Sequence, residues 1–337
     1  MAAANLTAGP CRLKELPALR RLLNEVFITE RGAQGDLFAY APLLYAEANL
    51  GNLRVVRRGR TIVGHAGILE RPIRWRGQVL RAGLIGGVCA RQDLRGEGIG
   101  TLAMQSAAER MAELRLDFGV LWSGSGGFYE RLGWRHAGGI AIMGIAEVAE
   151  DGDVRHEIMA LAESPFPPEE CHELHAAAGR NEVMRTPEET HIALTSAPHG
   201  ALLALAGGRL DGYAAYSGTS LAEIEGDVAA CVSLISHAAT LGQRICVFGL
   251  NDARIPAIEA ALPVSTQRRP LGMVLVVDRA GLVGKIEAET GLSAAELGIV
   301  ADLDDEALLA RVFGDADRPA SDDPLPLDLH IGYLDHV

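Results

Sequence analysis

The residue pattern with the clearest chemistry is a glycine-rich turn, Arg95-Gly96-Glu97-Gly98-Ile99-Gly100-Thr101, which follows an apolar run that ends at Val88-Cys89-Ala90. From Ile99 onward, apolar residues recur at helical spacing, so the turn is expected to open a long helix. The first amides of a helix have no partner within it, and the helix dipole gives them partial positive charge. Glycines allow such a backbone to close on a ligand. The pattern therefore predicts a phosphate or diphosphate site made of main-chain amides.

Two common phosphate motifs do not match this turn. A P-loop requires a lysine after its last glycine, and none follows here. The dinucleotide fingerprint requires GxGxxG within a parallel βαβ unit, whereas Gly96, Gly98 and Gly100 give GxGxG after a predicted antiparallel hairpin. The remaining pattern, Arg-x-x-Gly-x-Gly over residues 95–100, resembles the coenzyme A signature of the GNAT acetyltransferase superfamily.

This resemblance implies roles for residues on both sides of the turn. The strand end Val88, Cys89 and Ala90 would pair through its backbone with the pantetheine arm, and the amides of Arg95 to Thr101 would hold the pyrophosphate. Downstream, residues 123–134 resemble the terminal motif of the family, in which a tyrosine, here Tyr129, lies near the cofactor sulfur. Where the family often has an asparagine, this chain has Ser123.

Acetyl transfer to an amine needs a neutral nucleophile, a polarised carbonyl and a proton for the leaving thiolate. Tyr129 is the candidate general acid, since a tyrosine pKa of about 10 lies near that of a thiol. The alternative is a core aromatic with a satisfied hydroxyl. Amides at Val88–Ala90 are candidates for stabilising the oxyanion, and Cys89 is expected to be a small apolar filler. The base stays open among four side chains: Glu25, Asp36, Glu70 and His65.

The predicted elements around the turn form a mixed α/β layer. Helices are expected over residues 11–30 and Phe38–Ala48, followed by hairpins about residues 58–60 and 76–78. The helix from Ile99, a strand at Phe118–Trp122 and a short helix at Phe128–Leu132 come next. The fold class indicated is α/β (α+β), with a mixed, mostly antiparallel sheet flanked by helices.

The second half partly repeats this order, which indicates a tandem duplication. A hairpin at residues 201–217, a helix at Val228–Leu241 and a strand at Arg244–Phe248 are followed by a helix at Arg254–Leu262 and a strand at Met273–Val277. No glycine signature opens the helix after Gly226-Asp227, so the second GNAT-like domain is expected to be degenerate, without coenzyme A. The predicted division is a catalytic domain over 1–150, a degenerate domain over 151–280 and a C-terminal segment over 281–337.

This arrangement resembles the Eis-like acetyltransferases, although too few residues follow Val277 for their sterol-carrier-like third domain. The resemblance raises the hypothesis that the end of the chain, from Leu327 to Val337, returns to the active site. The alternative is that a terminal strand at Leu329–Leu334 completes a sheet. Cys171 and His175 share a helix face at metal-ligand spacing, but no third ligand is evident, so a solvated face and no metal site are expected.

Charge divides the chain as the repeats do. Residues 1–150 carry 19 basic and 14 acidic side chains, and the rest carries 12 and 30, giving net charges of +5 and −18. The basic half suits an anionic cofactor, whereas the acidic half would attract cations and disfavours nucleic acid. There is no apolar run long enough for a membrane span and no signal-like start, and the five cysteines form no disulfide or metal pattern, which predicts a cytoplasmic location.

Together these patterns predict an acyl-CoA-dependent N-acyltransferase that uses acetyl-CoA as co-substrate. The acetyl group would pass directly to a primary amine of a small, cationic acceptor, with Tyr129 as general acid. The alternative from another class is a non-catalytic acyl-CoA sensor or interaction module. The identity of the acceptor does not follow from the sequence, because acceptor pockets are built from loops. A homo-oligomer is possible, and the sequence does not give the oligomeric state.

Overall fold

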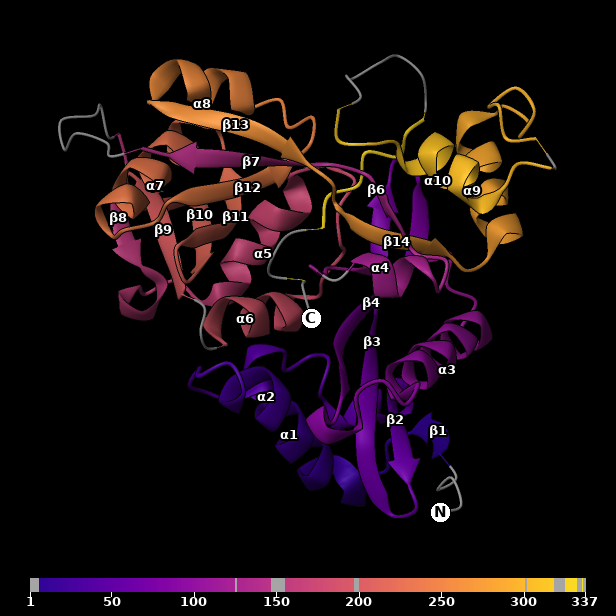
Figure 1. Cartoon of the computed structure of the whole chain (residues 1–337). Coiled ribbons are helices and arrows are strands. Elements are labelled where there is room, and N and C mark those ends of the chain that lie inside the picture. Colours follow the sequence, from indigo (N-terminus) through magenta and orange to yellow (C-terminus); the bar gives the residue numbers. More distant parts are fainter. Residues whose placement is uncertain are drawn as a thin grey trace.

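The computed structural model describes residues 6–124, 126–146, 155–196, 200–300, 302–317, 325–331 and 335. Within these residues the chain forms two seven-stranded sheets, each mixed, mostly antiparallel and flanked by helices (Figure 1). This confirms the predicted α/β class and its tandem arrangement.

The first sheet has the strand order β1-β2-β3-β4-β5-β14-β6, and only β4 and β5 are parallel. Helices α1 and α2 cover one face and α3 covers the other (Figure 1). The predicted hairpins, the helix from Ile99 and the strand from Phe118 are present. The bounds are β1 Leu6–Pro10, α1 Leu16–Asn24, α2 Leu37–Tyr40, β2 Leu53–Arg58, β3 Thr61–Trp75, β4 Gln78–Ala90, α3 Ile99–Glu113, β5 Phe118–Leu121, α4 Gly126–Glu130 and β6 Arg135–Ala137.

The second sheet repeats the first strand by strand, in the order β8-β9-β10-β11-β12-β7-β13, and only β11 and β12 are parallel. Helices α5 and α6 occupy the place of α1 and α2, and α7 that of α3. The bounds are β7 Ile140–Ile145, β8 Glu157–Ala160, α5 Pro168–Ala177, α6 Pro187–Thr195, β9 Gly200–Ala206, β10 Arg209–Ser217, β11 Ser220–Gly226, α7 Val228–Thr240, β12 Ile245–Gly249, α8 Ile255–Ala261 and β13 Val264–Arg269.

The two units exchange their last strands. β7 leaves the first unit and inserts between β12 and β13 of the second sheet, and β14, Gly272–Val276, inserts between β5 and β6 of the first. The sequence ranges 1–150 and 151–280 therefore each supply one strand to the other's sheet. Two further helices follow β14 (Figure 1): α9, Arg279–Thr290, packs against β4, and α10, Asp305–Phe313, packs against β6 and β14.

The helix predicted over Phe38–Ala48 is wrong in its extent. Helix α2 ends at Tyr40, and Ala41 has φ −134° and ψ 62°. The residue before a proline is excluded from helical geometry by the proline ring, so Pro42 ends the helix there. The helix predicted over 11–30 is α1, continued by one wider turn at Glu25–Thr29.

The predicted terminal strand is also not formed in its described part. Over residues 325–331 a single bridge joins His330 to Glu182, and residues 332–334 lie outside the described residues. All five cysteines are buried free thiols. No helix in the described part of the chain has the length and apolar character needed to cross a membrane.

Candidate active site

The first sheet forks where β4 and β5 separate. The two parallel strands pair over Ala82–Ile85 and Phe118–Leu121, and past these residues the edge of β4 that faces β5 has no strand partner. A cavity of about 600 Å³ opens in the fork. Its walls come from the ends of both strands, the start of α3, α4 and the turn after α1: Phe27, Arg31, Ile85, Gly86, Gly87, Val88, Cys89, Ala90, Arg95, Gly100, Leu121, Trp122, Ser123, Gly124, Phe128 and Tyr129.

The predicted cradle lies at the mouth of this fork. Gly98 is the residue that opens α3 and has φ +80°, and no side chain of the described residues caps the helix. The amides of Arg95 and Glu97 are used within the turn, on the carbonyls of Gln92 and Leu94 at 3.3 and 3.4 Å. The amides that lack an acceptor among the described residues are those of Gly96, Gly98, Ile99, Gly100 and Thr101. This cluster of donors suits an anion.

Glycines hold the cradle in place and keep it open. A Cβ on Gly64 of β3 would lie 2.3 Å from Ile99 Cγ2, so a glycine is required for the start of α3 to pack on the sheet. By contrast, a Cβ on Gly96 or Gly98 would meet no atom of the described residues within 4 Å. The space outside the free amides is therefore available to a ligand.

Tyr129, Ser123 and Cys89 meet in the wall of the cavity. Burial raises the pKa of Tyr129, the neighbouring Cys89 raises it further, and a hydrogen bond with Ser123 acts in the opposite direction. Burial also raises the pKa of Cys89 to about 12, which keeps its thiol protonated. The phenol is thus a proton donor at neutral pH, and the cysteine is a filler, as the sequence predicts.

The four candidate bases do not line the cavity. Glu70 pairs with Arg81 at 2.7 Å, Asp36 pairs with Arg20 and caps α2, and Glu25 is exposed. His65 is fully buried behind Gly87, whose carbonyl accepts its Nδ1–H at 2.8 Å. Burial lowers the pKa of His65 to about 4, so the ring is neutral, and its Nε2 has no hydrogen-bond partner in the described part of the chain.

Sequence reasoning missed Phe27 and Arg31, which enter the cavity from the wide turn after α1 and stack, with the guanidinium carbon 5.0 Å from the ring centre. Their placement depends on the wide turn at Glu25–Thr29, and no residue pattern in the sequence distinguishes such a turn from ordinary helix. Arg31 and Arg95 are the charged side chains among the described residues that line this cavity, and no carboxylate is among those residues. The charge suits an anionic ligand.

The helix face of Cys171 and His175 is buried rather than solvated, so this prediction is wrong. The sequence did not show that α5 packs between β10, β11 and α6. His175 meets Glu182 and Glu225, and possible metal-ligand atoms of the three lie within 4.8 Å of one another. The guanidinium of Arg180 already contacts both carboxylates. Burial opposes the positive charge on His175, but the carboxylates of Glu225 and Glu223 outweigh burial and raise the pKa of His175 to about 9. The cluster is therefore an ion network of His175, Arg180 and the glutamates around them.

The second unit has a fork of its own but no cradle. Eight residues, 91–98, separate β4 from α3, whereas Asp227 alone separates β11 from α7. The Asp227 carboxylate accepts the amide of Ala230 at 2.8 Å and so caps α7. A carboxylate at this position repels a phosphate, and no loop remains to surround one. The degenerate second unit predicted from the sequence has this physical basis.

Comparison with known proteins agrees with this geometry. Residues 9–137 match the acetyltransferase (GNAT) domain family. No curated protein matches the chain. A conserved Enterococcus faecalis protein, named as a probable N-acyltransferase, has the same fold with a TM-score of 0.64 and 15% identity, over 84% of this chain and 75% of that one.

Two further solved structures share the fold. The GCN5-related N-acetyltransferase of Anabaena variabilis has a TM-score of 0.60 and 16% identity, over 81% of this chain and 73% of its own. Eis1 of Mycobacterium abscessus has a TM-score of 0.57 and 15% identity, over 83% and 76%. The family match over residues 9–137 identifies a GNAT acetyltransferase domain in the first unit, which holds the cradle and the forked sheet, and the tandem fold of the chain is similar to that of Eis1.

Proposed function

We propose that this acyltransferase moves an acetyl group from acetyl-CoA directly to a primary amine of a small cationic acceptor. The observation that carries the proposal is that one cavity is lined both by cradle residues, Arg95 and Gly100, and by Tyr129. Acetyl-CoA supplies the activated thioester. The residues present fit it, since free amides and two arginines face the space where a diphosphate would bind.

The chain's own groups divide the work of the reaction. The free amides of Gly96 and of residues 98–101 bind the diphosphate. The unpaired edge of β4 at Val88–Ala90 orients the arm and donates to the carbonyl oxygen as it gains charge. Tyr129 holds its proton at neutral pH because burial raises its pKa. It gives that proton to the departing sulfur, and the hydrogen bond with Ser123 stabilises the phenolate that is left.

The acceptor must attack as a neutral amine. No carboxylate or histidine is among the described residues of the cavity wall, so the amine proton leaves to water. The net charge of −18 on residues 151–337 raises the local concentration of cationic acceptors. The same lack of a base is the observation that favours the alternative, a non-catalytic acyl-CoA sensor.

Replacing Tyr129 by Phe tests the proposal. The measurements are thiol release from acetyl-CoA across a panel of diamines, polyamines and amino sugars, and acetyl-CoA affinity by calorimetry. Loss of a positioned acid is worth about 10²–10⁴-fold in rate, so kcat is expected to fall by that factor. The affinity is expected to stay within about twofold, because the cradle is untouched.

The matched control is Tyr216→Phe, since Tyr216 lies on β10 of the second sheet, away from the first cavity. Equal turnover in Tyr129→Phe and the unmodified protein would remove the acid role. If the unmodified protein binds acetyl-CoA but releases no thiol with any amine of the panel, the sensor would be established instead.

A further inference from the structure

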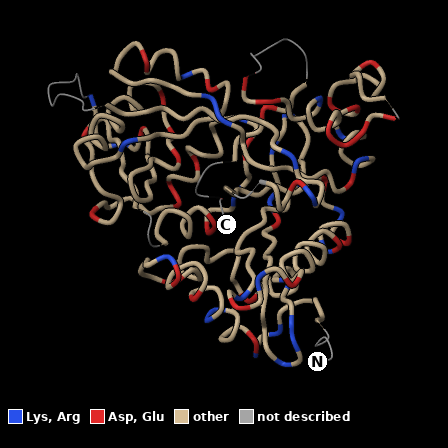
Figure 2. Tube along the Cα trace, in the orientation of Figure 1, with Lys and Arg blue, Asp and Glu red and all other residues tan. Residues whose placement is uncertain are grey.

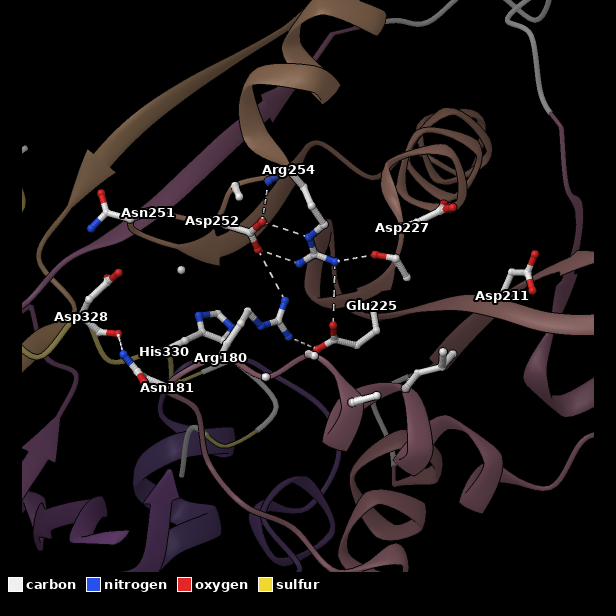
Figure 3. A pocket seen from close by; sticks show the side chains of 17 residues that line it. Arg180, Asn181, Asp211, Glu225, Asp227, Asn251, Asp252, Arg254, Asp328 and His330 are labelled. Atoms are coloured by element: carbon white, nitrogen blue, oxygen red, sulfur yellow. Dashed lines mark hydrogen bonds and ion pairs between the residues drawn. The ribbon is translucent and has the colours of Figure 1, made fainter. Parts of the chain in front are cut away.

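A second cavity, of about 570 Å³, lies in the fork of the second sheet (Figure 3). Strands β11 and β12 pair only through Ser220–Leu221 and Ile245–Cys246, so this fork opens early along the strands. The cavity is lined by the ends of both strands, the start of α7 and two residues near the end of the chain, Asp328 and His330. Its position corresponds to that of the first cavity, and its chemistry differs.

Five carboxylates and two arginines line this cavity: Asp211, Glu225, Asp227, Asp252 and Asp328, with Arg180 and Arg254. The arginines are already engaged in its floor, as Figure 3 shows. Arg254 binds Asp252 through two nitrogens at 2.6 and 2.9 Å, and Arg180 contacts Glu225 and lies 3.5 Å from Asp252. The positive charges of the cavity are therefore neutralised by part of its negative charges.

Two carboxylates remain without a cationic partner. Neither Asp227 nor Asp328 forms an ion pair with any residue in the described part of the chain. Burial and the neighbouring Asp252 raise the pKa of Asp328. A hydrogen bond with Asn251 and the positive charge of Arg268 lower it, but by less. A positive charge placed beside Asp328 would relieve this.

A second, independent observation is the histidine in the same wall. His330 is 92% buried, and its Nδ1 has no hydrogen-bond partner among the residues that the structure describes. That atom lies beside Gly249, another lining residue, 3.6 Å from where a Cβ would stand. Burial lowers the pKa of His330 to about 4, so the ring is neutral and offers one donor and one acceptor. A buried polar atom without a partner requires an explanation, and this one belongs to a side chain that lines the cavity.

From these contacts we infer that the second fork binds a small organic cation carrying two or more ammonium groups, held by Asp227, Asp328 and His330. Ammonium groups bring the positive charge that Asp227 and Asp328 lack, and they offer a hydrogen-bond donor to the unpaired nitrogen of His330. The volume lies within the range of small-ligand pockets, about 300–1,000 Å³. The site is separate from the acetyl-transfer cavity, and it stands or falls independently of the proposed reaction.

Calorimetric titration of the full chain with spermidine at low ionic strength tests the inference. The variants are Asp227→Asn and Asp328→Asn, and both are expected to fold. Asparagine caps a helix as well as aspartate does, and it tolerates the positive φ of 41° at residue 328. Each variant is expected to weaken binding about fivefold and the pair about 25-fold, since separated sites act additively.

Controls separate this site from general charge attraction and from the first cavity. Asp302→Asn, an exposed change between α9 and α10, is expected to leave the affinity unchanged, and 1,4-butanediol, a neutral probe, to give no heat. Saturating coenzyme A is expected to leave spermidine binding in place. No heat with spermidine, equal affinity in the double variant, or Mg²⁺ binding at these aspartates without spermidine binding would each overturn the inference.

Discussion

Arg185 is fully buried and joins three distant parts of the chain. Its guanidinium makes two hydrogen bonds to Glu223 of β11, at 2.7 and 2.9 Å, and two to Asp335, at 2.6 and 3.0 Å. Tyr213 donates to the same Glu223 at 2.6 Å, and Arg71 of β3 in the first sheet lies 3.9 Å from Asp335. One cation thus holds the second sheet, the α5–α6 connection and the end of the described chain together.

Arg185→Met is expected to destabilise the fold by about 3–5 kcal/mol at pH 7, because it leaves two buried carboxylates without their partner. That is a large part of the 5–15 kcal/mol typical of a native protein. Burial raises the pKa of Glu223, and the facing Arg185 reverses this and holds the pKa well below its usual range. Without the arginine, burial dominates, the folded pKa rises above the unfolded one, and the variant loses stability as pH increases. The deficit at pH 7 is therefore expected to shrink at pH 5.

Urea unfolding followed by circular dichroism at pH 7 and pH 5 measures both effects. Arg209→Met is the control, since that side chain is 80% exposed and its pair with Asp211 contributes little. The double variant Arg185→Met/Glu223→Leu is expected to recover part of the loss, since one orphaned charge is removed with its partner. A loss below about 1 kcal/mol, or the same loss at both pH values, would refute this account of the network.

Two further predictions concern the cradle and the ion network of the second unit. Gly98→Ala forces a side chain into φ +80°, so it is expected to lower the free energy of unfolding by about 1–2 kcal/mol and to weaken acetyl-CoA binding in calorimetry. The control, Gly284→Ala, lies within α9, where a Cβ would meet no described atom within 4 Å. It is expected to raise the free energy of unfolding in urea by about 0.5–1 kcal/mol. The pKa of His175 is raised from 6.5 to about 9, so its contribution is complete below pH 6.5 and lost as pH rises through 9; His175→Gln is expected to flatten the fall of unfolding free energy between these values. Unchanged affinity in Gly98→Ala, or an equal slope with and without His175, would contradict these expectations.

The parts of the fold that could be predicted carry their signals locally. The strand–turn–helix at residues 88–113 combines an apolar run, three glycines and a helical stripe within one stretch, and these fix the cradle whatever surrounds it. The strand β7, Ile140–Ile145, shows no alternation because its neighbours in the second sheet bury most of its residues. Its pairing with β12 spans about a hundred residues, and no local pattern encodes it.

The site could be predicted only where one segment makes it. Tyr129 and the cradle lie in continuous motifs, whereas Phe27 and Arg31 reach the cavity from a turn that is distant in the sequence. Charge, counted by halves, anticipated an acidic second unit, and Figure 2 shows acidic residues spread over it rather than gathered in one run. Which of them face one cavity depends on the fork between β11 and β12.

The exchange of strands connects the two forks. β5 forms one arm of the first fork and pairs with β14 from the second unit, and β12 forms one arm of the second fork and pairs with β7 from the first. Neither sheet is complete without a strand from the other unit, so the second unit has a structural role in the first sheet although it has no cradle of its own. The second unit thus completes the first sheet with β14, while its own fork is lined by carboxylates and a histidine in place of an amide cradle.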